Sequence, residues 1–74
     1  MDEESKPRHP RLIDGSKVQF WPLKRDAVAA AKLIGWRSTD VGQVWTRFQL
    51  GYAIRDNDGQ WMTKERFAFI RYIR

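Results

Sequence analysis

Cysteine is absent from this chain of 74 residues, and its one histidine, His9, lies in a short N-terminal stretch that also holds two prolines. Without cysteine there can be no disulfide bond, no thiolate zinc site and no cysteine nucleophile. A single histidine in a segment without apolar residues provides no positioned general base, no catalytic triad and no metal cluster. We therefore expect a protein that is not an enzyme, with no catalytic residue, no metal, no cofactor and no small-molecule substrate.

Long apolar runs are missing as well. No segment reaches the roughly 18 uncharged apolar residues that a membrane span requires. The N-terminus, which begins Met1, Asp2, Glu3, Glu4, lacks the basic and apolar order of a signal peptide. The sequence therefore predicts no membrane contact and a cytoplasmic location.

Aromatic residues, by contrast, are plentiful, with four Trp, four Phe and two Tyr. Hydrophobic residues make up 42% of the chain and charged residues 31%, which is typical of a folded globular protein. A chain of this length has room for one small core, and large aromatic side chains can supply much of its buried area. We expect most of the following to be structural: Phe20, Trp21, Trp36, Trp45, Phe48, Trp61, Phe67 and Phe69.

The domain organisation follows from composition. Residues 1–11 contain Pro7, Pro10 and balanced charges but no apolar run, so we expect a mobile N-terminal arm. Residues 12–74 should form a single domain. The net charge of the chain is +5, and the excess lies in this domain, which favours a phosphate backbone or an acidic protein surface as partner.

The first half of the domain predicts a strand followed by a helix. Residues 17–20 alternate between polar and apolar side chains, as a half-buried strand does. After Pro22, apolar residues recur on one helical face from Leu23 to Ile34, and Gly35 is placed to end the helix.

The second half predicts a further helix and a hairpin. Capping residues precede an apolar pattern at i, i+3, i+4 and i+7, which predicts a helix over residues 39–49. The turn-rich run Asp56 to Gly59 lies between two strand-like segments and predicts a β-hairpin over residues 52–63. Residues 64–74 suit either a helix or a strand, with Thr63 as a helix cap slightly favouring the helix.

The segment from Ala27 to Thr46 reads AVAAAKLIGWRSTDVGQVWT and resembles the helix-turn-helix element of the repressor family. That family requires one small residue, one glycine and four apolar residues at set places in a twenty-residue window. Those places hold Ala31, Gly35, Ile34, Trp36, Val41 and Val44. The resemblance implies an α+β fold, with a small helix-turn-helix core and a winged-helix-like hairpin, and a transcription regulator that binds DNA.

The same resemblance implies which residues contact DNA. Five positions at the start and on the outer face of the second helix would reach a major groove, namely Arg37, Thr39, Gln43, Thr46 and Arg47. Two more, Arg55 and Lys64, would lie beside the wing. The ordinary alternative is a solvated polar face.

A protein partner is the second hypothesis. Asp56 and Asp58 would place negative charge at the tip of the wing, which suits a basic protein surface better than phosphates. Arg66, Arg71 and Arg74 at the C-terminal end could contact an acidic surface. Size, basicity and an aromatic core also resemble small bacteriophage regulators that bind a bacterial RNA polymerase and alter transcription initiation or termination.

Overall fold

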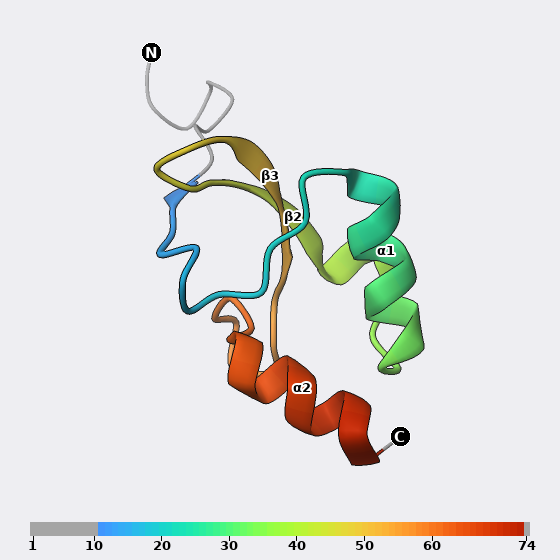
Figure 1. Ribbon diagram of the computed structural model, residues 1–74. Coiled ribbons are helices and arrows are strands. Elements are labelled where there is room, and N and C mark those ends of the chain that lie inside the picture. The colour runs from blue at the N-terminus through green and yellow to red at the C-terminus, as the bar shows by residue number, and fades with distance from the viewer. Residues whose placement is uncertain (1–10, 74) are drawn as a thin grey trace.

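The computed structural model describes residues 11–73, which form an α+β fold as expected. Its elements, in chain order, are β1 (Arg11–Leu12), α1 (Lys24–Leu33), the 3₁₀ turn η2 (Ser38–Asp40), β2 (Val41–Trp45), β3 (Leu50–Ile54) and α2 (Lys64–Ile73) (Figure 1). None of the helices in this described part of the chain is long and apolar enough to cross a membrane.

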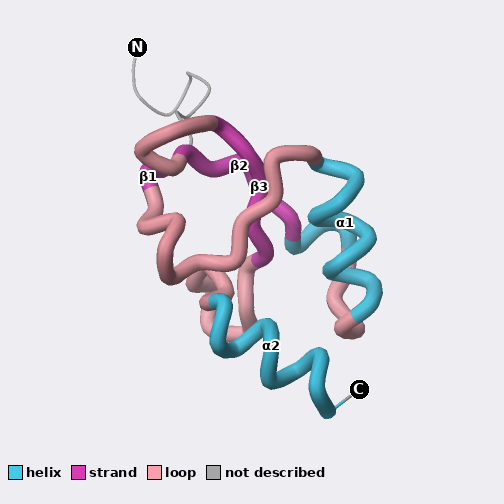
Figure 2. The backbone as a smooth tube through the Cα atoms, viewed as in Figure 1, coloured by secondary structure: helices cyan, strands magenta, loops and turns pink. Residues whose placement is uncertain are grey.

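The three strands form one sheet in the order β1-β2-β3. β2 and β3 are antiparallel, with Val41 opposite Ile54 and Trp45 opposite Leu50, and β1 runs parallel to β2. A long loop leads from β1 to α1 beside the sheet (Figure 2). The strand expected at residues 17–20 is reduced in this loop to one isolated bridge, from Val18 to Thr63, and a second bridge just after it joins Trp21 to Tyr52.

Helix α1 confirms the helix predicted from Leu23 to Ile34, since these residues are its N-terminal and C-terminal caps. Its small buried residues, Ala27 and Ala31, allow the helix to pack closely against the sheet. The helix ends because Gly35 adopts a φ of 88°, a left-handed conformation that favours glycine.

The helix predicted over residues 39–49 is wrong. Residues 39–49 contain the end of η2, strand β2 and the tight turn that follows it, so the segment from Ala27 to Thr46 holds one helix, a turn and a strand. The β-branched and aromatic residues of both strands favour a ladder, in which β3 pairs along its whole length with β2.

Gly42 is a further reason why this segment forms a strand and not a helix. A glycine inside a helix costs about 1 kcal/mol relative to alanine. In strand β2 its missing side chain is useful, because the Trp61 ring lies where a Cβ atom would be, with the nearest ring carbon 2.6 Å from that position. The sheet therefore gains an aromatic cover at this point.

Helix α2 resolves the ambiguity at the C-terminal end in favour of a helix. The Thr63 hydroxyl accepts a hydrogen bond of 3.1 Å from the amide of Arg66, as an N-terminal cap does. Phe67 and Ile70, three residues apart, are the buried residues of the helix.

Two further expectations are corrected in part. The turn at residues 56–59 is present, but of the predicted hairpin only an Arg55–Trp61 bridge and the hydrogen bonds around it form, because β3 pairs mainly with β2. The N-terminal arm expected at residues 1–11 lies outside the described residues except for Arg11, which belongs to strand β1.

The core lies between α1, the end of β3 and α2. Its buried members are Ala31, Ile34, Ile54, Met62, Phe67 and Ile70, with Trp21, Ala30, Trp36 and Val41 packed against them. Three of the aromatic residues expected to be structural, Trp45, Phe48 and Phe69, are instead exposed. These three rings are therefore available for contacts at the surface.

Candidate functional site

The residues expected to contact DNA do not share one face. Arg37 precedes η2 and Arg47 follows β2, so the two arginines lie at opposite ends of that strand. Gln43 is exposed on β2 between them, whereas Thr46 is buried. Thr39 is exposed in η2, and Lys64 is exposed at the start of α2. A single recognition surface made of all seven residues is therefore absent from the described structure.

Arg55 has a structural partner. Its guanidinium carbon lies 4.1 Å from the centre of the Trp61 ring, and its Nη1 donates a hydrogen bond of 3.0 Å to the carbonyl of Gly59. Asp56 similarly serves its own turn, since its Oδ1 accepts hydrogen bonds from the amides of Asp58 and Gln60. Asp58 is exposed at this turn. These contacts hold the turn together.

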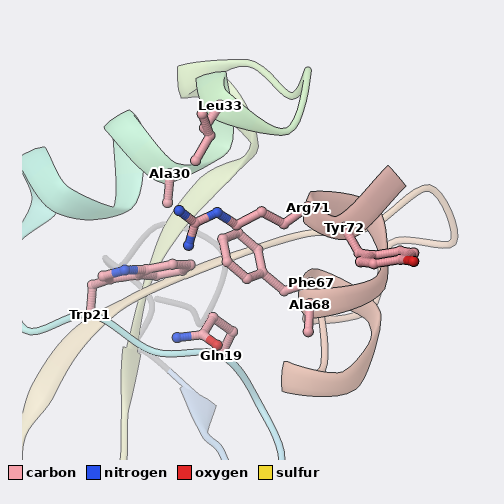
Figure 3. Close-up of a pocket in the computed structure, with 8 residues that line it drawn as sticks. All are labelled: Gln19, Trp21, Ala30, Leu33, Phe67, Ala68, Arg71 and Tyr72. Atoms are coloured by element: carbon pink, nitrogen blue, oxygen red, sulfur yellow. The ribbon is translucent and has the colours of Figure 1, made fainter. Parts of the chain in front are cut away.

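Of the C-terminal arginines, Arg66 and Arg71 are exposed on α2, and Arg74 lies outside the described residues. Arg71 is the one that faces a concave surface. An open groove of about 570 Å³ runs between α1 and α2, and we call it the interhelical groove. Its lining residues are Gln19, Trp21, Ala30, Leu33, Phe67, Ala68, Arg71 and Tyr72 (Figure 3).

The interhelical groove has an aromatic floor and a basic side chain. The rings of Trp21 and Phe67 meet edge to face, with centroids 5.3 Å apart and planes at 74°. Figure 3 shows the Arg71 side chain reaching from α2 across the groove toward α1. None of the lining residues is acidic.

Four large apolar side chains on α1 and α2 are exposed. Tyr72 is 87% exposed, Ile73 61%, Phe69 60% and Leu33 55%. Leu33 and Tyr72 line the groove itself, whereas Phe69 and Ile73 are exposed on α2 outside its lining. Exposed apolar side chains at the rim of a groove make it a candidate for binding a partner.

A second candidate surface lies at the tip of the β2–β3 hairpin. The buried Thr46 hydroxyl accepts hydrogen bonds from the amides of Phe48 and Gln49 and donates one to the carbonyl of Gln49. This network gives the four-residue turn a defined shape and presents Arg47 and Phe48 outward. Phe48 is 86% exposed, and the Arg47 guanidinium lies 5.6 Å from the centre of its ring.

A cleft of about 470 Å³ lies beside this turn, and we call it the tip cleft. Its lining residues are Asp14, Gly15, Ser16, Phe20, Thr46, Arg47, Phe48 and Gln49. Asp14 is held in place because its Oδ1 accepts hydrogen bonds of 2.6 Å from the Ser16 hydroxyl and 2.9 Å from the Ser16 amide. Hydrogen bonds from Ser16 lower the pKa of Asp14, as do the nearby charges of Lys17 and Lys64, so the carboxylate is ionised at neutral pH.

No known protein family, curated protein or solved structure matches the chain. Within residues 11–73, no group of three or more His, Cys, Asp or Glu side chains is placed to hold a metal ion. The interhelical groove and the tip cleft are therefore the two candidate functional surfaces of the described structure.

Sequence reasoning missed several residues of these surfaces. Phe48 was expected to be structural because the helical pattern placed it with Val44 and Trp45 on a buried face. Asp14 was expected only as part of a tight turn with Gly15, and Tyr72 only as a residue near which an exposed apolar patch would favour a protein partner. A useful signal was available at Thr46, whose hydroxyl can organise a tight turn that contains no glycine or proline.

Proposed function

We propose that this chain is a non-enzymatic interaction module that binds an acidic, amphipathic helix of a protein partner in the interhelical groove. The observation that carries the proposal is the combination of an aromatic floor, exposed Leu33 and Tyr72 at the rim, and Arg71 inside the groove. The resemblance to small bacteriophage regulators suggests a bacterial RNA polymerase as the partner.

Charge favours an acidic occupant. α1 carries three basic residues and one acidic residue, and α2 likewise carries three basic residues and one acidic residue. Both helices that border the groove are therefore net positive, and Arg71 is the charged residue that lines the groove itself. A partner helix with carboxylates beside its apolar stripe would be attracted to this surface and would keep its charges hydrated at the rim.

The shape of the groove favours a helix as occupant. A helix that binds in a groove inserts apolar side chains at i, i+3 or i+4, and i+7, which form one stripe along its surface. The groove is open and is bordered by two helices, and its apolar lining residues provide contacts for such a stripe. Arg71 could form a charge-assisted hydrogen bond with a carboxylate of the same helix.

The proposal is tested with a synthetic peptide that has leucine in a helical stripe and glutamate elsewhere. Replacing Leu33 and Tyr72 together by alanine should weaken binding of this peptide by about tenfold or more, as measured by calorimetry, since rim contacts are lost. Leu23→Ala is the matched control, because Leu23 is exposed at the start of α1 but does not line the groove.

A second peptide distinguishes specific binding in the groove from nonspecific hydrophobic association. When lysine replaces every glutamate of the peptide, its affinity for the unmodified chain should be about tenfold lower than that of the acidic peptide. The reason is that both helices bordering the groove are net positive. Equal binding of the acidic and basic peptides, or an equal effect of the Leu23 control, would refute the docking proposal.

DNA binding is the second candidate function, and the Arg47–Phe48 tip favours it. In this interpretation the β2–β3 hairpin acts as a winged-helix-like contact element, with Arg47 on a phosphate and Phe48 against a base. The logarithm of affinity should fall linearly with the logarithm of salt concentration, and Arg47→Ala should reduce the slope by about 0.7–0.9. Salt-independent binding, or no binding at low salt, would exclude this function.

A further inference from the structure

We propose that the tip cleft binds a guanine base, with Phe48 stacked on the base, Asp14 on its donor edge and Arg47 on the attached phosphate. The inference rests on the second candidate function, nucleic-acid binding at the hairpin tip, and makes it specific for one base. It is independent of protein docking in the interhelical groove.

The cleft is built from two turns that pack against each other. One is the Asp14–Ser16 turn, closed by hydrogen bonds from the amides of Lys17 and Val18 to the carbonyl of Asp14. The other is the hairpin turn organised by Thr46. Gly15 lies against the Thr46 methyl group, with only 3.0 Å between that carbon and the position of a Cβ atom on Gly15. The walls of the cleft are therefore mutually supported.

The apolar side of the cleft suits a flat ring. Phe20 is half-buried and its ring lies against Gly51, so it forms a fixed apolar surface. Phe48 is almost fully exposed on the other wall. Because the Thr46 hydroxyl already fixes the backbone of this turn, stacking of a nucleobase on Phe48 would have to order only the side-chain torsions of that residue.

The polar side of the cleft selects among bases. An ionised carboxylate only accepts hydrogen bonds. Asp14 lines the cleft, and its Oδ1 accepts both hydrogen bonds from Ser16, which hold the carboxylate at this place. Guanine presents two adjacent donors, N1–H and the N2 amino group, which match a carboxylate, whereas the single N–H of thymine or uracil is flanked by two carbonyl oxygens that a carboxylate repels.

The basic side of the cleft suits a phosphate. The Arg47 guanidinium lies over the Phe48 ring, 5.6 Å from its centre, so a base that stacks on this ring would lie close to a cation able to bind the attached phosphate. The same chemistry is offered by a free guanine nucleotide and by guanine within a single strand. The experiment therefore includes both sources.

The test compares two fluorescein-labelled strands of nine nucleotides, one of thymidine alone and one with a central dG, by fluorescence anisotropy at low salt. The dG strand should bind about tenfold more tightly to the unmodified chain. Guanosine monophosphate serves as the competitor, with thymidine monophosphate as its control. If guanosine monophosphate displaces the dG strand and thymidine monophosphate does not, the free guanine nucleotide is a sufficient ligand.

Two charge-matched variants assign the preference to Asp14. Asp14→Asn can keep the acceptor for Ser16 but presents a donor to the base, so it should abolish the preference for dG while still binding thymidine. Asp58→Asn removes the same charge at the turn remote from the cleft and should leave the preference unchanged. Circular dichroism confirms that both variants are folded.

The outcomes separate the inference from the function on which it rests. Equal affinity for the two strands, or a dG preference that survives in Asp14→Asn, would overturn the guanine site while leaving nucleic-acid binding at the tip intact. Failure of both strands and of guanosine monophosphate to bind at low salt would overturn the site and the second candidate function together.

Discussion

At the scale of single residues, three side chains define the two candidate surfaces by the bonds they make to backbone. Thr46 fixes the hairpin tip, Asp14 fixes the opposing turn, and Thr63 starts the helix that forms one wall of the interhelical groove. Each is a short polar residue whose oxygen caps nearby amides. The exposed residues that would meet a partner therefore project from turns and helices that are locally well determined.

Thr46→Val should remove the acceptor of two tip amides with almost no change in volume. We expect the free energy of unfolding to fall by about 1–2 kcal/mol, and hydrogen exchange of the Phe48 and Gln49 amides to accelerate. Thr46→Ser is the control, because it keeps the hydroxyl and loses only the methyl group. If both variants exchange these amides at the same rate, the hydroxyl does not organise the turn.

Asp14 predicts a pH dependence of stability. Its pKa is lowered in the folded state by Ser16, Lys17 and Lys64, so its contribution is complete above the unfolded value and is lost as the pH falls through the folded value. Stability should therefore decrease with acidification below about pH 4. In Asp14→Asn the decrease should be smaller, as urea unfolding at several pH values would show, and identical profiles would contradict the assignment.

At the scale of elements, the helices were predictable from the sequence and the sheet was only partly so. The α1 pattern, with Gly35 after it, and the Thr63 cap of α2 are local signals, and both helices form where those signals lie. The segment 41–45 carries an equally good helical pattern, but its structure depends on pairing with residues 50–54. Pairing between strands is not visible in the periodicity of either one alone.

The candidate surfaces were less predictable than the elements for the same reason. The interhelical groove combines the loop before α1, α1 itself and α2, which are distant in sequence, and the tip cleft joins residues 14–20 to residues 46–49. No spacing rule connects such segments. The basic character of the chain was available from sequence, and Arg47 and Arg71 were already candidates, but the residues that surround them in the two surfaces were not.

Gly51 tests the packing of the long loop on the sheet. A Cβ atom there would collide with the Phe20 ring and lie 2.5 Å from the carbonyl oxygen of Trp21, so backbone as well as side chain would have to move. We expect Gly51→Ala to cost about 1–3 kcal/mol in chemical denaturation. Gln43→Ala, at an exposed position of the neighbouring strand, should change stability by less than about 0.5 kcal/mol. An equally stable Gly51→Ala would show that Phe20 does not lie on the sheet.

At the scale of the whole molecule, α2 is the element whose two sides are both apolar. Phe67 and Ile70 pack into the core, while Phe69, Tyr72 and Ile73 remain exposed. A surface helix normally has a polar outer face. The C-terminal helix therefore both completes the core and carries the apolar surface that we propose as part of a protein interface, while the hairpin tip lies at a separate place on the molecule (Figure 1).

The docking claim is tested most directly by the indole signals of the four tryptophans in a ¹⁵N-labelled chain titrated with the acidic helical peptide. Trp21 lines the interhelical groove, whereas Trp36 donates its indole hydrogen to the carbonyl of Arg55, and Trp45 and Trp61 belong to the sheet region. We expect a saturable shift of the Trp21 signal with little change in the other three. A stationary Trp21 signal, or a larger shift at Trp45, would contradict docking in the groove.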